Sequence, residues 1–138
     1  MLNNERKDLC LYRLSKAKEY LEDAQKALGY EMYDTAANRS YYAIFHSVRA
    51  LQALSGKEFR KHSGVISGFQ MDYIKTGIFE KRLSDIIKHA FSLRTESDYE
   101  DFFIISREEV AEQVTDAKFF HGVISKYIDE FLSKAGIR

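Results

Sequence analysis

Hydrophobic residues recur at steps of three and four along most of this chain, which is the spacing of one face of an amphipathic helix. The first stretch predicts a helix from about Glu5 to Leu28, with charges such as Arg13 and Lys16 on its other face and Gly29 as its stop. After a short turn, the same spacing predicts a second helix from about Met32 to Leu54. Because the connection is so short, we expect the two helices to pack as an antiparallel hairpin.

The predicted second helix has two different apolar faces. Large side chains form one stripe along it, and alanines repeat every seven residues on the opposite side. The large stripe is Tyr33, Ala37, Tyr41, Ile44, Val48 and Leu51, and the alanines are Ala36, Ala43 and Ala50, with Arg39 and His46 beside them. We therefore expect this helix either to lie at the centre of the fold or to form a dimer interface through its small residues.

Three further helices follow in the pattern. A short one begins at Ser63 as its N-cap and runs to about Ile74, and a fourth runs from about Phe79 to near Tyr99. The last follows a capping-box spacing at Ser106–Glu109, and its bundle-like stripe includes His121, which we expect to be a hydrogen-bonded core residue. The result is an all-α fold, an up-and-down bundle of four to five helices in a single domain over residues 1–138.

Composition narrows the class of protein. The 138 residues contain no proline and seven glycines, which suits helices, and the 21 basic residues offset the 21 acidic ones. With no net charge, binding to nucleic acid must come from a local patch. A single cysteine, Cys10, fits a reducing compartment, and no apolar run is long enough to cross a membrane, so we expect a cytoplasmic protein with no membrane partner.

The sequence offers no pattern for a metal ion or a cofactor. The four histidines do not share a helix at ligand spacing, and no glycine-rich phosphate loop occurs. The acidic residues Asp98, Glu100 and Asp101 cluster, but the Glu-x-x-His pairs of ferritin-like metal sites are missing. We therefore expect neither a metal site nor a cofactor.

Several segments, in order, resemble one known family. They are Ala36-Ala-Asn-Arg-Ser-Tyr-Tyr-Ala-Ile-Phe-His46, Arg60-Lys-His-Ser-Gly-Val-Ile66, Lys75-Thr-Gly77 and Arg94-Thr-Glu-Ser-Asp-Tyr-Glu-Asp-Phe102. Together they are similar to the HEPN domain family (higher eukaryotes and prokaryotes nucleotide-binding), and the resemblance extends from roughly Tyr20 to Tyr127. It implies a small up-and-down helical bundle, often dimeric.

The resemblance also implies a function. Many prokaryotic members are the toxin half of a two-gene module, with a minimal nucleotidyltransferase as the antitoxin. Active members carry an arginine, four to six residues and then a histidine, and act as metal-independent ribonucleases. Arg39 and His46 are separated by six residues and fit this pattern as the catalytic pair. The residue after the arginine is often Asn, Asp or His in active members, whereas here it is Ser40.

The chemistry is consistent with these residue types. RNA cleavage without a metal needs a base, an acid and a cation for the charged phosphorane, roles that histidine and arginine can fill. Seven residues along a helix put Arg39 and His46 about 20° apart in azimuth and about 10 Å apart along the axis. They would flank one phosphodiester rather than touch. A two-fold dimer would pool two such pairs, so we expect a composite site and a nearly inactive monomer.

Further residues are candidates for binding RNA or a nucleotide. Tyr42 and Arg49 lie near the same stripe, and Tyr42 would stack on a base. The basic loop from Arg60 to His62 would hold backbone phosphate. Arg94, Asp98 and Tyr99 are expected either to form a local network that ends the fourth helix or to line a cleft.

Two functions remain open from the sequence. The first is a toxin-type ribonuclease restrained by a nucleotidyltransferase partner. The second is a non-catalytic module that dimerises through the alanine face, with Arg39 and His46 as a structural pair, and binds a nucleotide, RNA or a protein. A protein that binds long RNA usually has a basic surface. The zero net charge of this chain therefore favours a weak or specific RNA contact, or the non-catalytic module.

Overall fold

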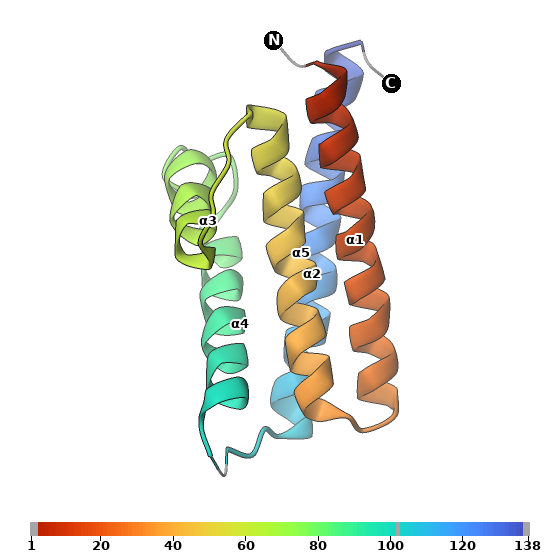
Figure 1. The fold of residues 1–138 in the computed structure, drawn as a ribbon, viewed down its shortest axis with the longest axis vertical. Helices are drawn as coiled ribbons and strands as arrows, with labels where there is room; N and C mark the ends of the chain where they lie inside the picture. The colour runs from red at the N-terminus through yellow and green to blue at the C-terminus, as the bar shows by residue number, and fades with distance from the viewer. Residues whose placement is uncertain (1–2, 102, 137–138) are drawn as a thin grey trace.

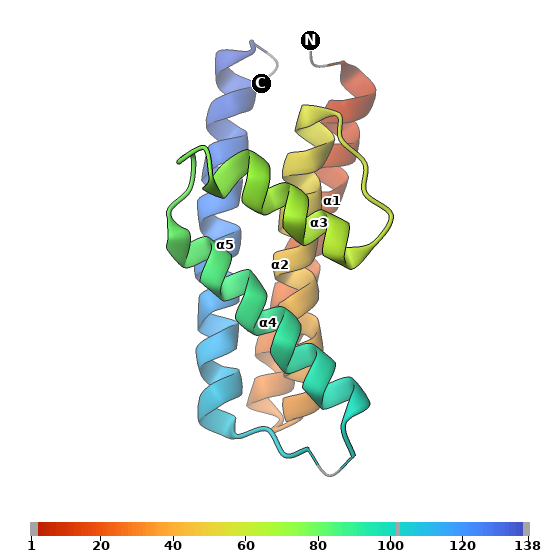
Figure 2. The ribbon, with the colours of Figure 1, turned by 90° about the vertical axis from the view of Figure 1, so that its left-hand side faces the viewer.

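The computed structural model describes residues 3–101 and 103–136, and within them every regular element is helical. The elements are α1 (Asn4–Gly29), α2 (Tyr33–Ser55), α3 (His62–Phe69), the π-helical turn η1 (Gln70–Ile74), α4 (Lys81–Tyr99) and α5 (Arg107–Lys134). The long helices α1, α2 and α5 lie side by side (Figure 1). Helices α3 and α4 cross the face of α2 and α5 obliquely (Figure 2). The predicted all-α bundle is confirmed.

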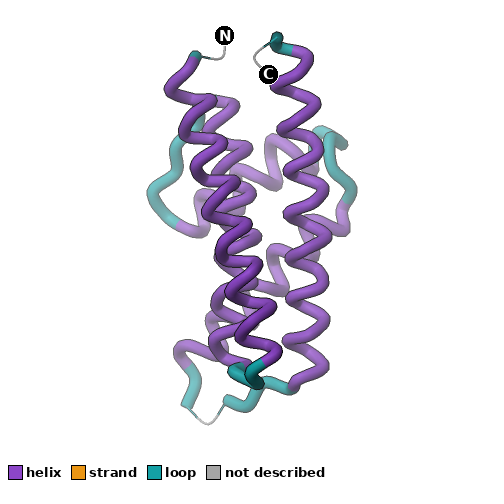
Figure 3. Tube along the Cα trace, turned by 90° about the vertical axis from the view of Figure 1, so that its right-hand side faces the viewer, coloured by secondary structure: helices purple, strands orange, loops and turns teal. Residues whose placement is uncertain are grey.

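Helix ends follow local signals closely. Asn3 caps α1 by accepting a hydrogen bond from the Arg6 backbone N–H at 2.8 Å, and the Ser106 hydroxyl accepts one from the Glu109 N–H at 3.1 Å. The start of α1 and the end of α5 lie at the same end of the bundle (Figure 3). The prediction that Ser63 caps the third helix is wrong: α3 begins at His62, and extended Lys61 is its N-cap residue.

Helix α2 is the central element of the fold. Its alanines Ala36, Ala43 and Ala50 are fully buried within the chain, because α1 packs along them with its own small residues. Among these are Ala17 and Ala24, which are also fully buried. The expectation of a central helix is confirmed, whereas the alternative of a dimer interface on the alanine face is wrong, since no surface is left there.

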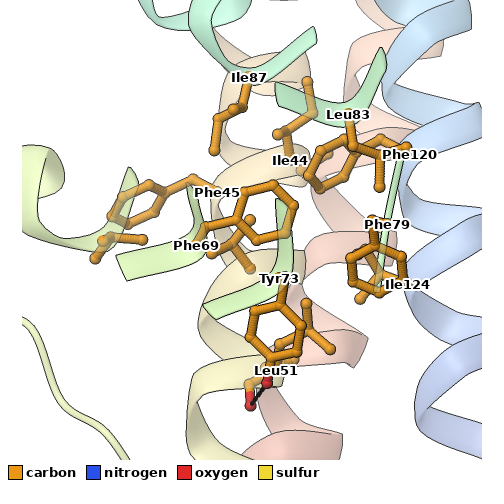
Figure 4. Close-up of a cluster of buried hydrophobic side chains, with 14 of the residues drawn as sticks. Ile44, Phe45, Leu51, Phe69, Tyr73, Phe79, Leu83, Ile87, Phe120 and Ile124 are labelled. Atoms are coloured by element: carbon orange, nitrogen blue, oxygen red, sulfur yellow. Dashed lines mark hydrogen bonds between the residues drawn. The ribbon is translucent and has the colours of Figure 1, made fainter. Parts of the chain in front are cut away.

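The largest part of the core lies where α2 meets α3, η1, α4 and α5. Aromatic rings dominate it, and Phe69, Tyr73, Phe79 and Phe120 converge there (Figure 4). The Tyr73 hydroxyl donates to the Leu51 carbonyl oxygen at 3.3 Å, so its polar end is satisfied inside the core. This packing fixes one side of α2 and leaves another side, next to α1 and the α2–α3 loop, to carry polar groups.

His121 on α5 has the structural role expected of it. Its Nδ1 lies 3.2 Å from the Ser47 hydroxyl of α2, and burial lowers its pKa. Arg13 differs from the expectation. It lies on the buried side of α1 rather than on the solvent face, with 7% of its surface exposed.

Candidate functional site

A stripe of half-buried polar side chains runs along α2 between α1 and α3. We call Arg39, Tyr42, His46 and Arg49 the α2 stripe. They follow one another at steps of three, four and three residues, so they share one side of the helix over about 15 Å. The stripe therefore places the predicted histidine between two arginines.

An aromatic ring covers the side chain of His46. The ring of Tyr20 from α1 stacks on it, with 5.3 Å between ring centroids and 3° between the planes. The buried Nδ1 of His46 has no hydrogen-bond partner among the described residues. Burial lowers the pKa of His46 to about 4, helped by the nearby charges of Arg49 and Arg13. At neutral pH the imidazole is uncharged, and an uncharged imidazole can accept a proton.

Arg39 also lies near Tyr20, because both residues line one cavity. Its guanidinium donates a hydrogen bond to the Asn38 side-chain oxygen. Together with Tyr20 and the α1 residues Lys16, Glu19 and Asp23, it lines a polar cavity of about 270 Å³. Tyr20 thus joins the surroundings of Arg39 and His46 into one surface. The two predicted catalytic residues are on one face, and they are linked through Tyr20 rather than by a contact of their own.

A second cavity, of about 480 Å³, adjoins the stripe at its Arg49 end. It collects three of the predicted binding residues, and its lining is Phe45, Arg49, Glu58, Phe59, Arg60 and His62. The helix α2 supplies its wall and the α2–α3 loop its rim. The volume falls in the range of small-molecule pockets, which is about 300–1,000 Å³.

His62 is fixed within this second cavity. Its Nδ1 lies 2.8 Å from the hydroxyl of Tyr41, and its ring stacks on Phe45 at 4.2 Å. Burial lowers the pKa of His62, and the charges of Arg94 and Arg49 lower it further. The uncharged form of His62 is therefore favoured, and the arginines supply the permanent positive charge of the cavity.

Arg94 holds the aromatic side of the stripe in place. Its Nε lies 3.1 Å from the Asp98 carboxylate, and a terminal nitrogen donates to the Tyr42 hydroxyl at 3.2 Å. Its guanidinium also lies over the rings of Tyr41 and Tyr42, at 5.3 and 5.5 Å. Tyr99 does not join this group, because its side chain is 73% exposed. The network orients Tyr42.

Three residues of the site were not among the predicted ones: Arg13, Tyr20 and Glu58. Arg13 donates to the Arg49 carbonyl oxygen at 3.1 Å and to Glu58 Oε1 at 2.9 Å. Arg13, Lys16 and Tyr20 follow one another at steps of three and four residues, so they share one face of α1. This polar face was the sequence signal that could have identified Arg13 and Tyr20. Glu58 sits in a loop, where no periodic signal exists.

Ser40, the residue after the candidate catalytic arginine, faces away from the site. It is fully buried, and its hydroxyl donates to the Ala37 carbonyl oxygen at 3.0 Å. It also accepts a hydrogen bond from the side-chain nitrogen of Gln113 on α5 at 2.9 Å. In this chain, the position that differs from the common pattern of active family members therefore contributes to core packing.

Among residues 3–101 and 103–136, no group of three or more His, Cys, Asp or Glu side chains lies together as a metal site would require. None of the described helices combines the length and the hydropathy needed to cross a membrane.

Comparison with known proteins places the chain. The model of the HEPN domain matches residues 11–127. A "UPF0332 protein" of Thermotoga maritima is 35% identical over 127 residues, which cover 92% of this chain and 96% of the relative. Two proteins of Methanocaldococcus jannaschii, each named "Putative toxin", are 31% and 30% identical over 83% and 96% of this chain, and over 78% and 98% of their own lengths. The ordered motifs, the helical bundle and these matches agree, and the chain belongs to the HEPN domain family.

Proposed function

We propose that this protein is a toxin-type ribonuclease of a toxin–antitoxin module, which cleaves RNA without a metal ion and is restrained by a nucleotidyltransferase partner. The observation that carries the proposal is the α2 stripe, in which an uncharged His46 lies between Arg39 and Arg49. The names of the two Methanocaldococcus relatives support the toxin class.

The proposed reaction is transesterification at an RNA phosphate. The uncharged imidazole of His46 takes the proton from a ribose 2′-hydroxyl, and the 2′-oxygen attacks the adjacent phosphorus. Arg39 stabilises the negative charge that builds on the phosphorane oxygens. The bond from phosphorus to the 5′-oxygen breaks, that oxygen takes up a proton, and a 2′,3′-cyclic phosphate remains.

The leaving oxygen can receive the proton that His46 has taken up, because an imidazolium of low pKa is a strong acid. We propose that a second copy completes the site, through a two-fold dimer that brings two Arg39–His46 pairs into one cleft. The alanine face is buried, so such a dimer would form over the α2 stripe. Tyr42 would stack on a base, and Arg49, Arg60 and His62 would hold neighbouring phosphate groups.

A non-catalytic module is the second candidate function. The observation in its favour is the aromatic cover of His46, with Tyr20 stacked on its ring and Nδ1 enclosed. In this case the same stripe would bind RNA, a nucleotide or a partner protein without cleavage.

One experiment separates the two candidates. The wild type, His46→Ala and, as a matched control, His89→Ala are induced in a bacterial host while growth and total RNA are followed. His89 is an exposed histidine on α4, paired with Glu109 at 3.8 Å and outside the site. The ribonuclease predicts arrested growth and cleaved RNA for the wild type and for His89→Ala, and neither for a folded His46→Ala.

The opposite results point to the alternative. If His46→Ala is folded and remains toxic, His46 is not catalytic. If no variant is toxic and purified protein does not cut RNA, the module is non-catalytic. Co-expression of a nucleotidyltransferase encoded next to this chain should suppress the toxicity and yield a complex of the two proteins on purification, if the partner is of that class.

A further inference from the structure

Arg13 is a buried cation whose counter-charge is exposed. The arginine has 7% of its surface exposed and donates to the Arg49 carbonyl oxygen and to Glu58 Oε1. A buried guanidinium without a nearby anion is strongly disfavoured, so Glu58 is what makes this position tolerable. Yet the Glu58 side chain is 64% exposed and belongs to the α2–α3 loop. The anion that neutralises a buried site therefore stays within reach of solvent.

Glu58 is also one of the residues that line the 480 Å³ cavity. Its carboxylate lines that cavity together with Arg49 and Arg60, whereas Arg13 does not line it. Glu58 Oε1 lies 2.9 Å from the Arg13 guanidinium and 3.9 Å from that of Arg49. The carboxylate thus lies within 4 Å of both guanidinium groups and connects Arg13, which is outside the cavity lining, with a residue of that lining.

The loop can release this carboxylate without unfolding. Lys57 forms an ion pair with Asp72 at 2.8 Å, and the ring of Phe59 packs against Gly64 and Gly68 of α3. These contacts anchor the residues on both sides of Glu58. Within the described part of the chain, the polar contacts of the Glu58 carboxylate itself are those with the two arginines. Rotation of one exposed side chain would therefore open the site.

We propose that Glu58 is a resident anion in a phosphate-monoester site formed by Arg13, Arg49 and Arg60, and that a terminal phosphate group replaces it. Guanidinium groups bind phosphate oxygens through paired charge-assisted hydrogen bonds, as they bind a carboxylate. The exchange makes and breaks no covalent bond. Identification of the ligand as the phosphorylated end of an RNA rests on the proposed function, but the phosphate site does not.

The three arginines give the site a preference for chain ends. A phosphodiester carries a single negative charge, so its exchange for Glu58 leaves the charge of the site unchanged. A phosphate monoester carries about 1.5 to 2 negative charges at neutral pH. It therefore gains attraction from the three arginines when it displaces the carboxylate. The arginines would thus favour a terminal phosphate over the RNA backbone, while Glu58 would lower the affinity for both.

The test measures binding to the full-length protein by calorimetry at fixed ionic strength. The first probe is inorganic phosphate. We expect Glu58→Gln to bind it at least about tenfold more tightly than the wild type, because the competing charge is gone while an acceptor for Arg13 remains. Arg60→Gln should bind it several-fold more weakly. Asp116→Asn is the matched control, since it removes a carboxylate paired with Arg82 at 3.8 Å elsewhere on the surface, and it should behave as the wild type.

The second probe distinguishes the source of the phosphate. Two 2′-O-methyl RNA oligomers of one sequence, with and without a 5′-phosphate, resist cleavage and differ only at the end. The wild type should bind the phosphorylated oligomer about tenfold more tightly, and Glu58→Gln should bind this oligomer more tightly than the wild type does. If inorganic phosphate shows the expected pattern and the oligomers bind equally, the site takes free phosphate. The phosphate site then stands, and the RNA end is excluded.

Other results would overturn the inference. Glu58→Gln that binds phosphate no more tightly than the wild type, or a gain of the same size in Asp116→Asn, means that no carboxylate is exchanged. Because Arg60 is exposed, Arg60→Gln should keep the fold and tests the site even if Glu58→Gln is unstable. Cleavage of unmodified RNA is measured in parallel. Phosphate exchange without cleavage refutes the ribonuclease alone, and cleavage without phosphate exchange refutes this inference alone.

Discussion

The low pKa of His46 makes a prediction about stability that does not depend on any activity. A histidine whose pKa falls from 6.5 to about 4 on folding binds its proton more weakly in the folded protein than in the unfolded chain. Its contribution to stability is therefore complete above pH 6.5 and is lost as the pH falls from there toward 4. Burial beside Tyr20 and the charges of Arg49 and Arg13 are the physical cause.

The size of the effect follows from the same values. Between pH 7 and pH 5, linkage gives a loss of up to about 2 kcal/mol in the free energy of unfolding. Because His46 is only partly buried, water screens part of the interaction, and we expect about 1 kcal/mol.

The assay compares urea unfolding of the wild type and His46→Gln at pH 7 and pH 5. Other groups also titrate in this range, including His62 and His121, whose pKa values are lowered as well. The informative quantity is therefore the difference between the two proteins. We expect the wild type to lose about 1 kcal/mol more than His46→Gln over this pH range. His89→Gln, at an exposed position on α4, serves as the control and should follow the wild type.

Two results would refute the reasoning. One is an equal loss of stability in the wild type and His46→Gln. The other is a His46 ring proton that titrates near pH 6.5 in an NMR pH series of the folded protein. Either result would mean that the imidazole is solvated, and His46 would then be as suited to donate a proton as to accept one.

Three further predictions concern the stability of the fold. Ala43→Leu should lower the free energy of unfolding by about 1–3 kcal/mol, because the site is fully buried, and should leave the molar mass in light scattering unchanged; a lost dimer with an intact fold would contradict it. Tyr41→Phe removes the 2.8 Å hydrogen bond to His62 and should cost about 1 kcal/mol in urea unfolding, with no change if that bond is not formed. Gly122→Ala, in open space on a helix, should raise the melting temperature, whereas Gly77→Ala, at a φ of 77°, should lower it; equal effects would contradict the helical assignment.

The sequence by itself determined the helices, whereas the central place of α2 was one of two alternatives until the structure showed its alanines buried. Apolar spacing located α1, α2 and α4 within two residues of their observed ends, because the signal for a helix is local. The third helix is less regular, and its last turn widens to a π-helical one at Gln70–Ile74. That change depends on how Tyr73 and Phe79 pack into the core, which no local pattern encodes.

Part of the candidate site could likewise be predicted from the sequence, and part could not. The motif placed Arg39, Tyr42, His46 and Arg49 on one side of α2, since positions on a single helix follow from its period. Only the tertiary structure decided that α1 buries the alanine face and brings Tyr20 onto His46.

The same holds for charge. In the sequence, Arg13 is one more polar residue on a charged helix face, and Glu58 is one acid in a basic loop. Their pairing at 2.9 Å joins residues 45 positions apart. Burial, and the pKa values that follow from it, depend on which helices pack together. The sequence of each helix therefore identifies the candidate groups, but it does not show the environment that sets their charge.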